Sequence, residues 1–194
     1  MNIRFFKIII ICICCMIFTS CNNKLISING NVSIGDTQNT VTIQTYSYYR
    51  VTSTQGIEYE IPTDWKTSER NGNTYHYSNG ENYLMVSNVS TKFSQDTDMV
   101  LTDNCATTLL ENLNQYSGFT LQTDCTGDID GAYCRKIICS YFDDNKNIIT
   151  EYTTIFTVNG TVYSFDYVSL NSASKNDEFF RRITGSVIIS PSDI

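Results

Sequence analysis

The sequence predicts an α+β fold in which an antiparallel β-sheet lies between helices. Much of the chain alternates apolar and polar residues with the period of a half-buried strand. Short turns join successive strands, so they should pair as hairpins, and Asn159-Gly160 is the strongest such turn. Two segments, one ending before Gly118 and one ending at Gly185, instead place apolar residues at helical spacing. Because amphipathic helices need a sheet face to cover, a single sandwiched domain is expected over residues 46–194.

The first strands are short and are separated by Gly, Asn and Pro. Residues 48–53 and 57–61 flank Thr-Gln-Gly as a hairpin, and Pro62 ends the second strand. Residues 74–77 and 83–89 form another pair around Ser-Asn-Gly-Glu-Asn.

The longer helix has both a start signal and an apolar stripe. Asp96, Thr97 and Asp98 offer capping oxygens and favourable charge in the first turn. Gly118 ends the segment. The stripe that should cover the sheet consists of Ala106, Leu109, Leu110 and Leu113.

The second half is a meander followed by the shorter helix. Residues 119–125 and 132–142 form a hairpin around Asp-Ile-Asp-Gly, and 148–158 and 161–169 form the next. The last helix, from about Ser174, is followed by a closing strand at 186–190 and should bury Phe179, Phe180 and Ile183.

The N-terminus has the pattern of an export signal. Two basic residues precede the apolar run 8–18, which is too short to span the roughly 30 Å hydrocarbon core as a helix. The run closes in Thr19, Ser20 and Cys21, and so resembles the bacterial lipoprotein signal, in which the cysteine is acylated and becomes the mature N-terminus. Residues 1–20 are therefore expected to be the signal peptide, with ordinary secretion or an uncleaved anchor as the alternatives.

The leader also contains three other cysteines, Cys12, Cys14 and Cys15, which sit in an unbroken apolar stretch. Metal sites need thiolates held apart by turns, so these residues act as small hydrophobes and no metal is expected. Residues 21–45 are rich in Asn, Ser, Thr and Gly and should form a flexible tether that begins at the lipidated Cys21.

The charge of the chain argues against nucleic acid as a partner. It has 20 acidic and 13 basic residues, and loss of Arg4 and Lys7 with the leader leaves 11 minus 20, or −9. Membrane association is therefore expected to come from the lipid.

The body contains four further cysteines. An even number in an exported chain suggests two disulfides, with reduced thiols as the alternative. A hairpin centred on Asp-Ile-Asp-Gly would place Cys125 directly opposite Cys134. Cys139 would face the other side of the sheet and could meet Cys105 on the covering helix.

No catalytic or cofactor motif stands out. The single histidine, His76, has no evident partner, and residues 126–131 resemble a calcium loop whose closing position would be Ile137, which cannot bind calcium. We therefore expect no enzyme, no metal and no cofactor. Three tyrosines at the tether junction, Tyr46, Tyr48 and Tyr49, are the predicted binding surface.

Four stretches in this order resemble the PsbP/DcrB superfamily: residues 57–62 followed by Trp65, residues 131–134, residues 159–163 and residues 179–186. The resemblance covers about residues 48–190. It implies a PsbP-like α/β/α sandwich and members that act as binding or assembly modules. It transfers no functional residues, because partner surfaces differ among members.

The expected function is thus a lipid-anchored envelope protein on the outer face of a bacterial membrane, binding another envelope protein without catalysis. A lipoprotein that binds a small molecule or a glycan is the first alternative. A hydrolase is the second, and it would need His76 buried beside an unpaired Cys105 or Cys139.

Overall fold

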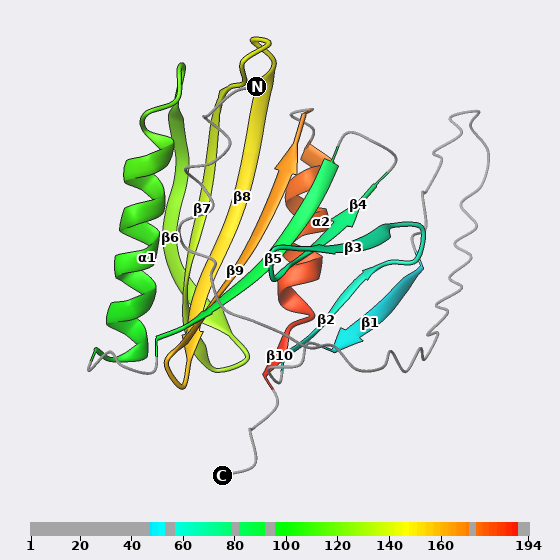
Figure 1. Ribbon diagram of the computed structural model, residues 1–194, viewed down its shortest axis with the longest axis vertical. Coiled ribbons are helices and arrows are strands. Elements are labelled where there is room, and N and C mark those ends of the chain that lie inside the picture. The colour runs from blue at the N-terminus through cyan, green and yellow to red at the C-terminus, as the bar shows by residue number, and fades with distance from the viewer. Residues whose placement is uncertain (1–46, 53–56, 79–81, 92–95, 171–173, 190–194) are drawn as a thin grey trace, which may run out of the picture.

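The computed structural model describes residues 47–52, 57–78, 82–91, 96–170 and 174–189, which form two antiparallel sheets and two helices (Figure 1). The predicted signal peptide and tether, with Cys21 and Tyr46, lie outside these residues. The strands are β1 Tyr48–Thr52, β2 Ile57–Pro62, β3 Lys66–Arg70, β4 Asn73–Tyr77, β5 Asn82–Ser90, β6 Thr120–Ile129, β7 Ala132–Phe142, β8 Ile148–Val158, β9 Thr161–Ser169 and β10 Ile188–Ile189, and the helices are α1 Asp98–Leu113 and α2 Ser174–Gly185.

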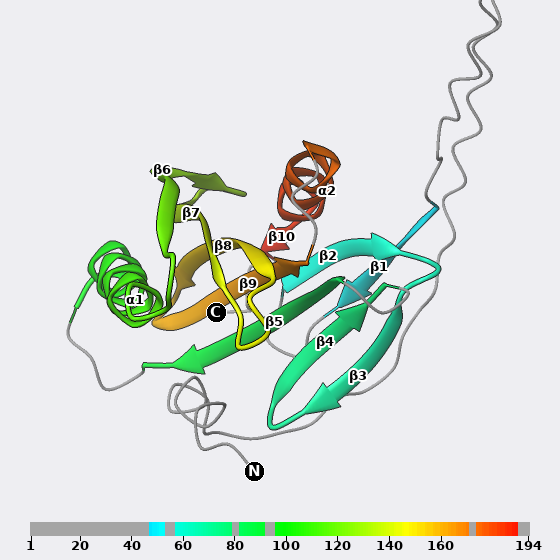
Figure 2. The ribbon, with the colours of Figure 1, turned by 90° about the horizontal axis from the view of Figure 1, so that it is seen from above.

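The large sheet has seven strands in the order β3-β4-β5-β9-β8-β7-β6, and the small sheet has the order β1-β2-β10. The helix α1 packs on β7, β8 and β9 from one side, whereas α2 and the small sheet cover the other side (Figure 2). The predicted α+β sandwich is confirmed, with one addition: the second layer contains a sheet as well as a helix. None of the helices in the described ranges is long and apolar enough to cross a membrane.

The main core lies between the large sheet and the layer of α2 and β2. Phe156 and Phe165 are fully buried at its centre, and Tyr59 and Ile183 reach them from the second layer. A smaller core under α1 contains Leu101, Ala106, Ile137, Ile155 and Val162, with Leu109 and Leu110 packed against it. The predicted apolar stripe of the long helix is therefore confirmed. Strand β8 lies between both cores and is buried at every position from Ile149 to Thr157.

Strand β3 was not predicted from the sequence. All five of its residues are polar and exposed, so no apolar alternation marks it. Its signal is the turn that joins it to β4, because Asn71 and Gly72 have φ angles of 54° and 79°. Positive φ at both central residues is typical of a tight two-residue hairpin turn, which Asn-Gly favours.

The predicted register of the β6–β7 hairpin is wrong by two residues. Asp130 and Gly131 form a two-residue turn, with φ angles of 45° and 84°, in place of a four-residue turn. Ile129 consequently pairs with Ala132, which puts Cys125 opposite Lys136 and Cys134 opposite Gly127. Cys125 and Cys134 are thus not the directly opposed pair that the disulfide prediction required.

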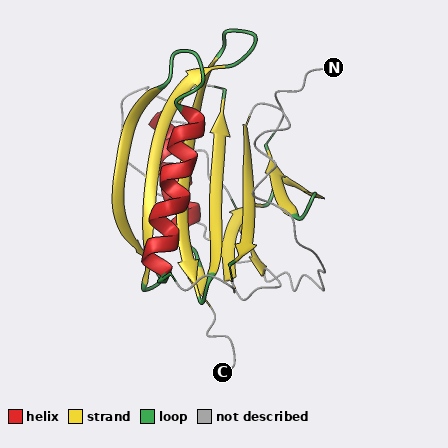
Figure 3. Cartoon of the chain, turned by 60° about the vertical axis from the view of Figure 1, so that its left-hand side comes forward, coloured by secondary structure: helices red, strands yellow, loops and turns green. Residues whose placement is uncertain are grey.

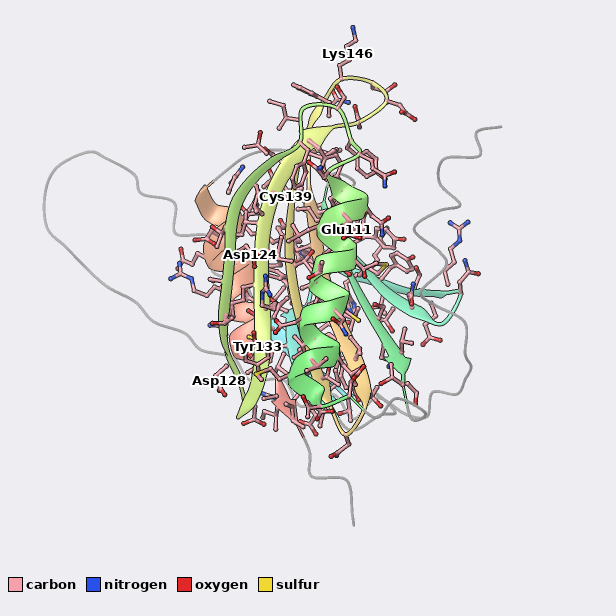
Figure 4. All side chains as sticks on the ribbon, turned by 90° about the vertical axis from the view of Figure 1, so that its left-hand side faces the viewer. Glu111, Asp124, Asp128, Tyr133, Cys139 and Lys146 are labelled. Atoms are coloured by element: carbon pink, nitrogen blue, oxygen red, sulfur yellow. The ribbon has the colours of Figure 1, made fainter. Side chains whose placement is uncertain are left out.

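The four cysteines of the body, Cys105, Cys125, Cys134 and Cys139, are free thiols in the structure. Cys139 is on the opposite face of β7 from Cys134, as predicted, and lies on the α1 side (Figure 4). It forms no disulfide with Cys105.

Candidate functional site

Part of the large sheet on the α1 side carries a cluster of tyrosines. The contacts of α1 are with β7, β8 and β9, and the helix runs along only part of the sheet (Figure 3). Beside this covered part, Tyr75 and Tyr77 of β4 lie next to Tyr83 of β5, which is paired with Tyr77. The Tyr75 and Tyr77 rings stack with centroids 6.1 Å apart, and Tyr83 lies 6.3 to 6.4 Å from both. Tyr77 is 39% exposed, so the cluster reaches solvent.

A second tyrosine pair lies at the end of α1. Tyr116, in the turn after the helix, stacks on Tyr141 of β7 with ring centroids 4.7 Å apart. The Tyr141 hydroxyl donates a hydrogen bond of 2.8 Å to Oε2 of Glu151. This contact connects the second pair to a carboxylate in the middle of the sheet.

Two acids, Glu151 of β8 and Asp166 of β9, are buried side by side on this face. They are only 8% and 7% exposed. The Thr153 hydroxyl lies 3.5 Å from Oε1 of Glu151 and 2.9 Å from Oδ1 of Asp166, and Ser164 donates to Oδ2 of Asp166 at 2.8 Å. Among the described residues no Lys, Arg or His forms an ion pair with either acid. Buried carboxylates are usually paired with a cation, which makes this arrangement unusual.

Burial without a cation changes the titration of both groups. Burial first, and then the charge of Asp166, raises the pKa of Glu151 from 4.5 to about 7. Burial raises the pKa of Asp166 from 3.8 to about 6, against the hydrogen bonds from Ser164 and Thr153. The pair therefore retains protons at pH values where ordinary carboxyl groups have lost them.

The tyrosines and the acids form one electrostatic unit. Burial and then the charges of Glu151 and Asp166 raise the pKa of Tyr83. Burial and Glu151 likewise raise the pKa of Tyr141. We call this set the tyrosine–acid face, and its members are Tyr75, Tyr77, Tyr83, Tyr116, Tyr141, Glu151 and Asp166. It offers aromatic faces and hydrogen-bond acceptors, which is chemistry suited to binding.

The edge of the tyrosine–acid face is basic. Lys66 and Arg70 of the edge strand β3 are exposed and pair in register with Tyr77 and Asn73 of β4. The face thus changes from positive at β3 to negative at β8 and β9.

Two of the three tyrosines of the predicted surface at the tether junction, Tyr48 and Tyr49, lie in one strand. Tyr46 lies outside the described residues. Tyr48 and Tyr49 are adjacent in β1 and so point to opposite faces of the strand. The guanidinium carbon of Arg182 lies 4.1 Å from the centroid of the Tyr48 ring, and the Tyr49 hydroxyl is 3.1 Å from Oγ1 of Thr67. Both side chains are half-buried and packed within the domain.

His76 is a buried structural residue. It is fully buried, with Nε2 3.0 Å from the Tyr59 hydroxyl and Nδ1 2.9 Å from Oγ1 of Thr67. Burial lowers its pKa to about 4. It faces the α2 side of the sheet, whereas Cys139 faces α1 and has a pKa raised to about 12 by burial and Glu151. The arrangement required for Cys-His catalysis is therefore not present between these residues.

The described residues also contain no group of three His, Cys, Asp or Glu side chains placed to hold a metal ion. The 126–131 segment, which resembles a calcium loop in sequence, forms the end of β6 and the turn into β7. Its Asp128 accepts a hydrogen bond from the Gly131 amide at 3.0 Å, as expected for a hairpin turn.

Sequence comparisons find no matching family model and no matching curated protein. Comparison of structures finds the same fold in cyanobacterial PsbP (CyanoP) from Synechocystis, with a TM-score of 0.55, 15% identity and coverage of 78% of this chain and 97% of that one. The Ran-binding protein Mog1p of Saccharomyces cerevisiae matches with a TM-score of 0.53 and 9% identity over 75% of this chain and 96% of that one. Protein PA94 of Pseudomonas aeruginosa, of unknown function, matches with a TM-score of 0.50 and 12% identity over 75% and 99%. These similarities confirm the PsbP-like fold, and at such identities they show the fold alone.

Proposed function

We propose that this protein is a lipid-anchored envelope protein that acts as a non-catalytic binding or assembly module for another envelope protein. The tyrosine–acid face carries the proposal, because tyrosine is enriched where proteins bind one another and gives contact area at little entropic cost. The Ran-binding protein Mog1p, which has a similar fold, supports it by analogy. The leader sequence supports the anchor and the location on the outer face of a membrane.

If acylated Cys21 anchors the protein, the Cys21→Ala variant should lose its membrane association. Each buried acyl CH₂ contributes about 0.8 kcal/mol, so removing the acylated residue should move the protein to the soluble fraction. Cell fractionation and metabolic palmitate labelling would measure this, with Cys15→Ala as the matched control that should stay on the membrane. A Cys21→Ala protein that still fractionates with membranes would show that the anchor lies elsewhere.

If the partner binds the tyrosine–acid face, the Tyr77→Ser variant should bind that partner more weakly. Crosslinking and capture from the native envelope would identify what the wild-type protein binds. Because tyrosines often dominate an interface, Tyr77→Ser should weaken binding of that partner by about tenfold. Tyr48→Ser removes a half-buried tyrosine outside the face and should have little effect on affinity. Equal binding by the Tyr77→Ser and wild-type proteins would mean that the partner uses another surface.

A glycan or another small molecule is the alternative occupant, because aromatic rings beside carboxylate acceptors also suit sugar hydroxyls. In that case the captured material would contain no specific protein, and a soluble glycan would shift the melting temperature of the wild-type protein but not of Tyr77→Ser.

A further inference from the structure

We propose that the tyrosine–acid face receives a lysine or arginine side chain from the partner protein, which would lie over Glu151 and Asp166. This inference rests on the proposed function and adds the chemistry of the partner to it. Three independent features of the face support it: two carboxylates without a cation, an acceptor oxygen without a donor, and clustered aromatic rings.

The carboxylates are the first feature. Among the described residues, the side chains that donate hydrogen bonds to Glu151 and Asp166 are the hydroxyls of Tyr141, Thr153 and Ser164. Four described arginines form ion pairs at other acids: Arg50 with Glu58 and Glu60, Arg135 with Asp103 and Asp124, Arg181 with Asp177, and Arg182 with Glu60. The two most deeply buried acids of the described residues thus have no cation beside them from these residues.

The second feature is an acceptor on the same face of the sheet. Asn73 of β4 is 9% exposed, and its Oδ1 is buried without a hydrogen-bond partner among the described residues. Its amide nitrogen lies 3.7 Å from Sδ of Met85, which in turn pairs in register with Asp166. An unpaired buried acceptor favours a ligand that donates hydrogen bonds, as an ammonium or guanidinium group does.

The third feature is the rings. A cation over a tyrosine face is stabilised by the ring quadrupole, most strongly where water is excluded. The same contact already occurs within this chain, where Arg182 lies over Tyr48. Tyr75, Tyr77 and Tyr83 flank the acids and would leave a cation between aromatic faces and carboxylates. Because Lys66 and Arg70 repel a cation at the β3 edge, it would lie toward β8 and β9.

The test uses the full-length lipidated protein in detergent and the partner captured from the envelope. Affinity is measured for wild type and for Glu151→Gln/Asp166→Asn, which keeps shape and hydrogen bonding but removes both charges. The matched control is Glu69→Gln/Glu111→Gln, which removes the same number of charges from exposed acids of β3 and α1. Glu111 is labelled on α1 in Figure 4. Melting curves of all three proteins verify that each one is folded.

We expect the acid-pair variant to bind the partner about tenfold more weakly at low salt, as the loss of a close charge pair produces, and the control to bind normally. Replacing the partner's basic residue by methionine should cause no further loss in the acid-pair variant, which a double-mutant cycle would show. If wild type binds its partner through Tyr77 but the acid-pair variant binds equally well, the proposed function stands and this inference fails. Capture of no partner, or competition by a soluble glycan, would overturn both.

Discussion

Replacing Glu151 with glutamine should stabilise this protein by about 3 kcal/mol near pH 8. The pKa of Glu151 is raised by burial and by Asp166 from 4.5 to about 7, and the gap between these pKa values corresponds to that free energy. Glutamine avoids the cost of burying the charge. It also preserves the contacts, because its carbonyl oxygen can accept from Tyr141 while its amide donates to Thr153.

The effect should depend on pH in a defined direction. A carboxyl group whose pKa is raised by folding binds protons more tightly in the folded state. Its contribution to the free energy of unfolding is therefore complete below its pKa in the unfolded chain and is lost as pH rises through its pKa in the folded protein. For Glu151 the loss falls between about pH 4.5 and about pH 7. The advantage of Glu151→Gln should therefore be largest near pH 8 and small near pH 4.5.

Urea unfolding at both pH values would measure the difference in free energy of unfolding. Glu111→Gln is the matched control, since Glu111 is exposed on α1 and its substitution should change the stability by less than about 0.5 kcal/mol. A Glu151→Gln protein that is less stable than wild type near pH 8 would mean that the ionised carboxylate is favourable where it lies.

The stability cost of Glu151 and Asp166 also bears on function. Strongly shifted pKa values are concentrated at functional sites, and stabilising substitutions at such sites commonly impair activity. We therefore expect the variant that gains stability here to lose partner binding. A purely structural pair would gain stability without changing affinity.

The sequence predicted the hairpins well because their turns are local. Asn159-Gly160 determines the β8–β9 pairing, and the long helix followed from its capping residues and apolar stripe. The same turn signal at Asn71-Gly72 marks β3, but the strand itself is an exposed polar edge strand without alternation. The error in the Cys125 register arose from the length of one turn, which moves every cross-strand pair.

The sequence contains the information that brings the two acids together on one face. A two-residue turn at Asn159-Gly160 places Asp166 opposite Thr153, and Glu151 is two residues from Thr153 on the same face of β8. The sequence does not show how much of the large sheet α1 covers. Whether Tyr77 is exposed and Glu151 is buried depends on where the helix lies across the sheet, which is a property of the tertiary packing.

Buried His76 should make the protein less stable in acid, and the His76→Leu substitution should abolish this loss. The loss has the opposite sign to the effect of protonating Glu151. Burial lowers the pKa of His76 from 6.5 to about 4. The hydroxyls of Tyr59 and Thr67 can both accept hydrogen bonds from a protonated ring, so burial, and not hydrogen bonding, is what opposes the charge. As pH falls below 6.5 the unfolded chain takes up a proton that the folded protein does not. Stability is therefore present above pH 6.5 and is lost toward pH 4, by about 3 kcal/mol.

In the wild-type protein this loss overlaps the gain from protonating Glu151 and Asp166, whose pKa values are raised to about 7 and about 6, so the contributions offset each other. The test is best made in the Glu151→Gln/Asp166→Asn background, where unfolding free energies near pH 7 and near pH 4 should differ by about 3 kcal/mol. Adding His76→Leu costs about 1 to 3 kcal/mol near pH 7, because the Tyr59 hydroxyl loses its partner. The difference between the two pH values should disappear. If the variant with all three substitutions still loses that stability in acid, the histidine is not its source, and the pH dependence comes from other groups in the folded chain.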